Sequence, residues 1–325
     1  MRVFITGATG FVGGALARAL IAEGAEVHAL VRPASSRYAL DGVPVRWHEG
    51  DITDPESLSS FLSRAEWVIH SAGQLGEAGL SEDVYQRLNV VGARNVLAAA
   101  KASGLGPRVL HVSSPGVLGP TGKKLADETA PYNASNWYEK TKAAAEDVVR
   151  SYAAQGLPVT MARPGFIYGP GDKHVLRLFQ AVKQGRFFYI DGGTHICHPT
   201  FIADAVQGML LCLKNGRAGE AYHILGPKPV TFRELGTELA RALDVRPPRF
   251  SIPKPLAMVG AMSLELAGKL TGKKPPLTRT GVDFFGQDRQ YSWEKAHREL
   301  GYQPRYELNE GIAQTVAWYK QQSWI

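Results

Sequence analysis

Tyr138 and Lys142 lie four residues apart in a segment with helical periodicity, so their side chains share one face of the expected helix. A free phenol has a pKa of about 10 and is a poor base at neutral pH. An ammonium group beside it favours the phenolate and brings proton transfer toward the working range. This spacing is common on amphipathic helices, so by itself it favours a structural pair.

A glycine-rich stretch, Thr6–Gly13, follows the strand-like run Val3–Ile5 and precedes a helical pattern. Gly7 permits a tight turn, Gly10 lets the backbone approach a pyrophosphate, and Gly13 lets the helix pack on the strand. The helix N-terminus offers N–H groups to phosphates. Three glycines alone are weak evidence. Their position between strand and helix predicts a dinucleotide site that includes Gly7, Gly10, Phe11, Val12 and Gly13.

Strand-like runs alternate with helical patterns through the first half of the chain. Strands are expected at Val27–Val31, Val45–His48, Val68–Ser71, Val109–Ser113 and Val159–Arg163, and helices at Pro55–Arg64, Asp83–Ser103 and Tyr138–Gln155. The rhythm predicts an α/β fold, a Rossmann doubly wound parallel sheet. Residues 1–165 are assigned to a dinucleotide-binding domain, to which 195–225 return, and residues 166–325 mainly to a smaller substrate-binding region.

Along nearly its whole length the chain resembles the extended short-chain dehydrogenase/reductase family, which includes NAD-dependent epimerases and dehydratases. The joint order and spacing of the matching segments are highly specific: Thr6–Gly13, Gly50–Ile52, His70–Gly73, Asn89–Gly92, Val112–Ser114, Tyr138–Lys142, Arg163–Gly165 and Tyr168–Pro170. The resemblance implies an enzyme that transfers a hydride directly between a nicotinamide and its substrate, with no metal.

The resemblance also implies roles for single residues. Tyr138 exchanges the proton of the substrate oxygen, Ser114 hydrogen-bonds that oxygen, and Lys142 holds the nicotinamide ribose. On the cofactor side, Asp51 and Ile52 would contact the adenine, Ser71 and Ala72 the pyrophosphate and ribose, and Pro164 and Gly165 the nicotinamide amide. Asn89 is assigned to the cofactor side, although a buried amide that satisfies backbone groups would also fit.

The expected second strand ends with two basic residues, Arg32 and Arg37, where NAD sites place an acidic residue for the ribose 2′-hydroxyl. Two guanidinium groups and no carboxylate suit a 2′-phosphate. We therefore expect NADP as the cofactor, and NAD stays open because both arginines could simply face solvent.

The C-terminal half resembles the 3β-hydroxysteroid and sterol dehydrogenase branch, through Ile252-Pro253, Pro276–Arg279, Tyr291-Ser292 and Glu299–Pro304. The expected substrate is therefore a secondary alcohol or ketone of sterol-like character. The apolar stretch Leu256–Leu270 would suit such a substrate, but we expect an ordinary core helix there. A lid over the pocket and a helix resting on a membrane surface are the alternatives.

Two other functions compete with the dehydrogenase. Nucleotide-sugar epimerases use the same Tyr–Lys chemistry, but the chain has Arg163-Pro164-Gly165 where many of them carry Arg-Tyr-Phe-Asn. Dehydratases place an acidic pair after the active-site hydroxyl, whereas Ser114 is followed by Pro115-Gly116. A non-catalytic cofactor-binding protein typically loses the Tyr or the Lys, and this chain keeps both.

Composition narrows the partners. The formal charge is +7, and the excess looks spread along the chain with no basic run beyond pairs such as Lys123-Lys124, so no nucleic-acid partner is expected. Two cysteines and no signal-like start favour a cytoplasmic protein. No apolar run is long enough to span a membrane, and the histidines lack the spacing of a zinc site. A homodimer is expected through the two long helices, where small residues would allow close approach: Ala93, Ala98, Ala99, Ala100, Ala143, Ala144 and Ala145.

Overall fold

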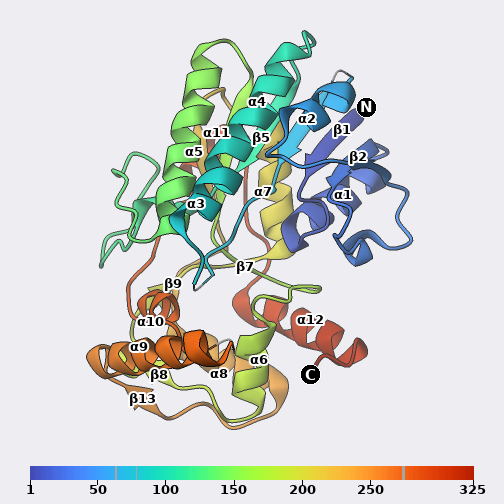
Figure 1. Cartoon of the computed structure of the whole chain (residues 1–325). Coiled ribbons are helices and arrows are strands. Elements are labelled where there is room, and N and C mark those ends of the chain that lie inside the picture. The colour runs from blue at the N-terminus through green and yellow to red at the C-terminus, as the bar shows by residue number, and fades with distance from the viewer. Residues whose placement is uncertain (63, 78, 273–274) are drawn as a thin grey trace.

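A seven-stranded parallel sheet organises the molecule, with strand order β11-β6-β5-β4-β1-β2-β3 (Figure 1). The computed structural model describes residues 1–325 except 63, 78, 273 and 274. The strand order reverses between β1 and β4, which is where doubly wound sheets bind ligands. The strands are β1 (Arg2–Thr6), β2 (Glu26–Val31), β3 (Arg46–Glu49), β4 (Trp67–His70), β5 (Arg108–Val112), β6 (Val159–Pro164) and β11 (Ala221–Ile224).

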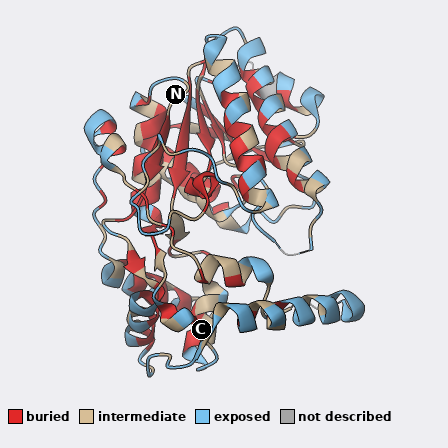
Figure 2. Ribbon diagram, turned by 90° about the vertical axis from the view of Figure 1, so that its left-hand side faces the viewer, coloured by how far each residue is buried: buried red, intermediate tan, exposed pale blue. Residues whose placement is uncertain are grey.

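Helices cover both faces of this sheet, so its strands are buried between two helical layers (Figure 2). One layer contains α1 (Phe11–Ala22), α7 (Ile202–Asn215) and α11 (Glu294–Leu300). The other contains α2 (Pro55–Leu62), α4 (Gly92–Ala102) and α5 (Trp137–Ala154). Because both faces are covered, β1, β4, β5, β6 and β11 are buried almost throughout rather than alternating, whereas the edge strand β3 is not buried.

The second region lies beyond the carboxyl ends of the sheet strands (Figure 1). Its helices are α6 (Leu176–Lys183), α8 (Phe232–Leu243), α9 (Lys254–Thr271), α10 (Arg279–Phe285) and α12 (Leu308–Gln321). Three short ladders connect them: β7 (Phe166–Tyr168) with β10 (Pro199–Phe201), β9 (Ile196–Cys197) with β12 (Val230–Thr231), and β8 (Tyr189–Ile190) with β13 (Ser251–Ile252). Aromatic side chains such as Phe179, Phe232 and Tyr319 form a separate core here.

The α/β class and the parallel sheet confirm the sequence prediction, and the expected strands agree with the observed ones to within about a residue. The return of the chain is also seen, because β11 pairs with β6. The helix expected at Pro55–Arg64 ends at Leu62, and residue 63 lies outside the described part. The helix expected at Asp83–Ser103 is instead α3 (Glu82–Tyr85), a π-helical stretch over Gln86–Val91, and α4.

Two expectations about helix faces need correction. The segment Leu256–Leu270 is helical, as part of α9, but it is not a core helix: among its described residues only Ala257 and Ala261 are buried. The reason is that α9 packs through these two small residues and the partly buried Met258, while its other large apolar side chains point outward. The alanines expected at a dimer interface also largely face inward, since Ala93, Ala100, Ala143 and Ala145 are buried within the chain. No helix in the described ranges is long and apolar enough to cross a membrane.

Candidate active site

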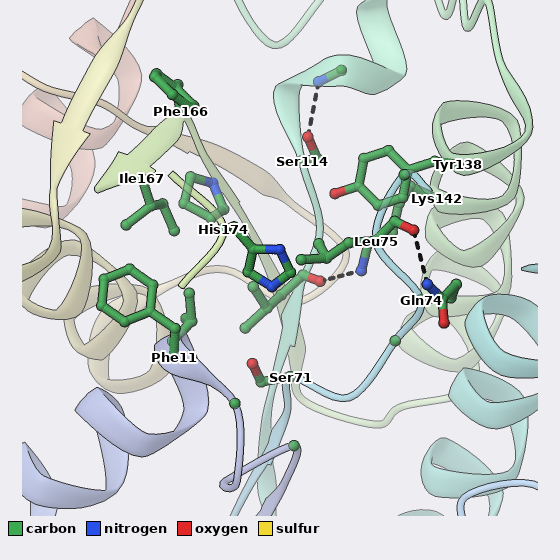
Figure 3. Close-up of a pocket in the computed structure, with 18 of the residues that line it drawn as sticks. Phe11, Ser71, Gln74, Leu75, Ser114, Tyr138, Lys142, Phe166, Ile167 and His174 are labelled. Carbon is green, nitrogen blue, oxygen red and sulfur yellow. Dashed lines mark hydrogen bonds between the residues drawn. The ribbon is translucent and has the colours of Figure 1, made fainter. Parts of the chain in front are cut away.

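A cavity of about 990 Å³ opens at the carboxyl ends of β1, β4, β5 and β6 and continues to the second region. Figure 3 shows two walls, with Tyr138, Lys142 and Gln74 on one and Phe11, Phe166 and Ile167 on the other. The cavity therefore joins the glycine turn to the residues expected to carry the chemistry.

The turn after β1 is built so that only glycine fits at two of its positions. Gly7 has φ +78°, and a Cβ there would lie 2.6 Å from the Ala72 nitrogen. A Cβ on Gly13 would lie 2.2 Å from the Gly7 carbonyl oxygen, so α1 could not start this close to the strand. At Gly10 the closest atom to such a Cβ is 3.3 Å away. The result is a bare backbone surface against the cavity, which fits a dinucleotide pyrophosphate at the helix N-terminus.

Most of the expected cofactor residues line this cavity. They are Gly7, Gly10, Phe11, Val12, Gly13, Arg32, Asp51, Ile52, Ser71, Ala72, Tyr138, Lys142, Pro164 and Gly165. Asp51 is held in place because its Oδ1 accepts hydrogen bonds from the Thr53 N–H and hydroxyl, each at 2.8 Å. The structure thus brings together segments that are far apart in sequence.

Arg37 and Asn89 do not line the cavity as the structure describes it. Arg37 lies beyond the end of β2, where its guanidinium pairs with Glu49 at 3.5 Å and covers the Trp47 ring. The expected pair of arginines around one phosphate is therefore reduced to Arg32.

Asn89 lies in the π-helical stretch, and its side-chain amide is hydrogen-bonded to backbone and side-chain partners. Its Oδ1 accepts from the Gln74 N–H at 2.7 Å, and its Nδ2 donates to the Gln74 carbonyl and to Thr141. The residue thus ties the loop after β4 to α5. It positions a wall of the cavity, so the buried-amide alternative describes it better than a cofactor contact.

Tyr138 stands in the first turn of α5, and the cap of that helix orients it. Asn136 caps the helix by accepting the Glu139 N–H at 3.0 Å, and the Ser135 N–H and hydroxyl donate to the Glu139 carboxylate. The Tyr138 hydroxyl points toward Ser114 (Figure 3). Burial raises the pKa of Tyr138 above its usual 10, and the neighbouring Ser114 hydroxyl only partly opposes this.

Lys142 lies one turn further along α5, and its Nζ donates to the Val112 carbonyl at 2.7 Å. Burial lowers the pKa of Lys142 to about 8, against the opposing effect of the Glu146 carboxylate. His70 and His111 lie close by, and burial holds the pKa of His70 at about 3 and that of His111 well below 6.5. Near neutral pH Lys142 therefore carries a positive charge in this wall. Burial is the largest influence on the pKa of the phenol, and it acts against the lowering that is expected from Lys142 together with an oxidised nicotinamide.

A buried ion pair supports this wall from behind. Arg163 at the end of β6 donates to both oxygens of Glu146, at 2.8 and 2.7 Å. Ser113 donates to the same carboxylate at 2.6 Å. Because Ser113 precedes Ser114 and Glu146 follows Lys142 by one turn, the hydrogen bond from Ser113 to Glu146 links the chain just after β5, which carries Ser114, to the helix that carries Tyr138.

Sequence reasoning missed most of the substrate side of the cavity. Its lining includes Phe166, Ile167, Leu178, Phe187, Phe284 and Phe285, with His174, Arg177 and Arg289. Arg289 is nearly buried and pairs with Glu139 at 2.8 Å. These residues come from several distant segments, so no local pattern marks them. His198 also lines the cavity, where its Nε2 is hydrogen-bonded to the Gly226 carbonyl, whereas His195 lies outside the lining, between Asp191 and Asp288.

Among the described residues no group of three or more His, Cys, Asp or Glu side chains is arranged to hold a metal ion. The chain belongs to the NAD dependent epimerase/dehydratase family, whose family description matches residues 3–225. This family contains NAD-dependent enzymes, so the glycine turn and its cavity belong to an enzyme of that class.

Three curated relatives illustrate the range of this similarity. A 4-hydroxy-2-methyl-3-oxo-4-farnesyl-3,4-dihydroquinoline-1-oxide ketoreductase from Stigmatella aurantiaca is 31% identical over 96% of this chain and 95% of its own. A 2-alkyl-3-oxoalkanoate reductase from Stenotrophomonas maltophilia is 32% identical, covering 98% and 99%. A decarboxylating sterol-4-alpha-carboxylate 3-dehydrogenase from Saccharomyces cerevisiae is 29% identical, covering 90% and 88%. The resemblance to the extended dehydrogenase/reductase family and its sterol branch is confirmed.

A solved structure agrees with the same fold. A dTDP-glucose 4,6-dehydratase from Streptomyces venezuelae, solved with NAD bound, superposes with a TM-score of 0.82 at 28% identity, covering 100% of this chain and 98% of that one. The similarity to an NAD-containing protein extends over the whole chain.

Proposed function

We propose that the protein is an NAD(P)-dependent oxidoreductase that transfers a hydride between a nicotinamide and a secondary alcohol or ketone. The observation that carries the proposal is the placement of Ser114, Tyr138 and Lys142 on one wall of the cavity that also contains the glycine turn. The nicotinamide supplies the hydride chemistry when bound. The protein supplies binding, orientation and the proton.

In carbonyl reduction, Tyr138 donates its proton to the substrate oxygen while Ser114 holds that oxygen by a hydrogen bond. A raised phenol pKa suits this direction, because the hydroxyl keeps its proton at neutral pH. In alcohol oxidation the phenol must instead lose its proton. The Lys142 ammonium and the positive charge of an oxidised nicotinamide would both favour the phenolate. Lys142 would also hold the ribose of a nicotinamide bound along this wall.

The proposed substrate is apolar and sterol-like or similarly bulky. Support comes from the aromatic lining of Phe166, Phe187, Phe284 and Phe285 and from the names of the reductase and sterol dehydrogenase relatives. We propose NADP as the preferred cofactor on the strength of Arg32, which lines the cavity after β2. The loss of Arg37 from this site weakens the preference and leaves NAD as the competitor.

The decisive experiment replaces Tyr138 by Phe. Turnover of a bulky ketone should fall by a factor of about 10²–10⁴, because the proton donor is lost. Cofactor affinity, measured by fluorescence titration, should change little. Tyr152→Phe on the same helix is the matched control and should retain full activity. Turnover that survives in Tyr138→Phe would rule out this residue as the proton donor.

A second candidate is a nucleotide-sugar epimerase, which the family membership favours. It would use the same wall but return the hydride to the substrate, so reduced cofactor would not accumulate. Incubating the protein with ketones and with UDP- or dTDP-sugars, and following cofactor absorbance and product configuration, separates the two. Cofactor binding without turnover of either class would instead favour a non-catalytic protein.

We also propose a cytoplasmic homodimer and the division into residues 1–165 with 195–225 and a substrate region in 166–325. The faces of α4 and α5 that remain accessible include Ala98, Ala99 and Ala144. Light scattering coupled to size exclusion tests the dimer directly. A monomer at micromolar concentration would contradict it.

A further inference from the structure

The helix α9 exposes a row of large apolar side chains. Leu256, Val259, Leu266 and Leu270 are 65%, 62%, 61% and 81% exposed, and Met262 and Leu264 on the same helix are 53% and 38% exposed. Phe250, just before β13 and α9, is 81% exposed. Positions 256, 259, 266 and 270 fall on one side of a helix with 3.6 residues per turn. The row is therefore a continuous apolar stripe.

The inner side of α9 explains why the stripe is left outside. Ala257 and Ala261 pack in a small cluster with Ile190 and Val282, the latter from α10. In Figure 1, α9 lies at the outer edge of the second region, with α10 between it and the sheet. The exposed residues of the stripe thus contribute little to the packing of this chain.

The sequence around the stripe is strongly basic. Residues 246–279 contain seven of the 37 lysines and arginines of the chain but only one of its 30 acidic residues, Glu265. Glu265 is paired with Arg279 at 2.8 Å, and Asp283 nearby is paired with Lys254 at 3.0 Å. The prediction that the excess of basic residues is spread along the chain is therefore wrong. Most of the formal net charge of +7 comes from this segment.

We propose that the stripe, with Phe250, docks the protein on an anionic lipid surface. An apolar helix side flanked by basic residues is the usual form of a helix that lies in a membrane interface. Each nearby Lys or Arg adds attraction to anionic lipid. A second copy of this chain is a poorer occupant, because a symmetric contact would bring two such basic segments together. The docking needs no helix that crosses the bilayer.

The position of α10 gives the docking a consequence for the cavity. This helix packs on the inner side of α9 and contributes Thr280, Gly281, Phe284 and Phe285 to the cavity lining. A helix with its side chains is about 10 Å across. Docking through α9 therefore places the apolar part of the cavity about one helix away from the lipid, where sparingly soluble substrates concentrate.

The test is flotation of the full-length protein with vesicles of phosphatidylcholine alone or mixed with phosphatidylglycerol. The protein should float with the anionic vesicles, and raising the salt concentration should release it. The variant Leu256→Ser/Val259→Ser/Leu266→Ser should bind at least about tenfold more weakly. The charge variant Arg249→Glu/Lys269→Glu should weaken binding to anionic vesicles only.

Leu105→Ser/Leu125→Ser is the matched control, because both leucines are exposed elsewhere on the surface. It should float like the unchanged protein. Melting temperature and cofactor binding of every variant show whether it is folded, and neither readout depends on the substrate. The proposal is overturned if the unchanged protein ignores anionic vesicles or if the stripe variant floats as well as the control. It is also overturned if the stripe variants instead abolish a lipid-free dimer or a stable protein complex.

Discussion

The two parts of the cavity are built in different ways. The part proposed to hold the cofactor, called the cofactor part, includes the bare glycine turn after β1 and the chain at the end of β4. The part proposed to hold the substrate, called the substrate part, is lined by residues of β7, α6 and α10, among them large aromatic side chains. A backbone surface tolerates few substitutions and fits one ligand class, whereas a wall of side chains can change shape one residue at a time. The difference accounts for one family carrying reductases, epimerases and dehydratases on one cofactor site.

The ion pair between Glu146 and Arg163 belongs to both parts, since it supports the wall where they meet. Arg163→Met would leave a buried carboxylate without its main partner and should lower the free energy of unfolding by about 3–5 kcal/mol. Arg150→Met is the control, because Arg150 contacts the same carboxylate at 3.3 Å from a half-exposed position and should cost less than about 1 kcal/mol. Urea denaturation of both variants provides the comparison.

The stability lost in Arg163→Met should depend on pH in one direction. Burial acts to raise the pKa of Glu146, but the hydrogen bonds and charge of Arg163 outweigh it and hold the pKa below 4.5. A carboxyl with a lowered folded pKa adds stability above its unfolded pKa and loses it as the pH falls. The difference in the free energy of unfolding between the unchanged protein and Arg163→Met should therefore become smaller as the pH falls. A difference that stays constant down to pH 3 would mean that Arg163 contributes through packing instead.

Phe284 tests whether the substrate part can be altered without the cofactor part. Its ring lines the cavity and stacks edge-on against Phe166, with ring centroids 5.2 Å apart. Phe284→Ala should raise the KM for a bulky ketone by about tenfold or more, because apolar contact area is lost. The Kd of the cofactor should stay within about twofold. Phe284→Leu keeps most of the apolar volume and should restore much of the affinity. Equal losses for ketone and cofactor would show that the two parts are not separable.

The sequence predicts the cofactor part of the cavity better than the substrate part. The turn from Thr6 to Gly13 and the Tyr138–Lys142 pair are local patterns, and each was placed correctly on its element. Phe284 and Arg289 come from segments that are brought to the cavity only by the tertiary fold. No spacing in the sequence therefore marks them as cavity residues.

The predicted cofactor contacts failed where a side chain has a partner within the protein. Arg37 finds Glu49 on the neighbouring strand, and Asn89 finds the backbone of Gln74. The outer side of α9 differs from the predicted core helix for a related reason. An apolar pattern predicts that something covers a helix, but it does not say whether the cover belongs to the same chain.

The two arginines after β2 allow a test of the cofactor preference within one segment. Arg32 lines the cavity, whereas Arg37 pairs with Glu49. Arg32→Ala should weaken NADP binding by about tenfold and leave NAD binding nearly unchanged, since only NADP carries the 2′-phosphate. Arg37→Ala should alter both by less than about twofold. Equal effects of the two variants on NADP would restore the two-arginine interpretation, and no effect of either would favour NAD.

The smallest expected effect concerns the charge on Lys142, where the two parts meet. With a pKa of about 8, the ammonium predominates below that pH and is lost as the pH rises. The kcat/KM for the cofactor, which reports groups of the free protein, should therefore decline above about pH 8.

Glu146→Gln should move this decline to lower pH, because the carboxylate that favours the ammonium is gone. Asp147→Asn removes a neighbouring carboxylate that is 70% exposed and should leave the profile in place. If the role of Glu146 is purely structural, its replacement should lower kcat/KM at every pH and leave the pH of the decline unchanged. A decline that moves to lower pH assigns Glu146 an electrostatic role at the Lys142 ammonium. A decline that stays in place confines Glu146 to holding Ser113 and Arg163 together.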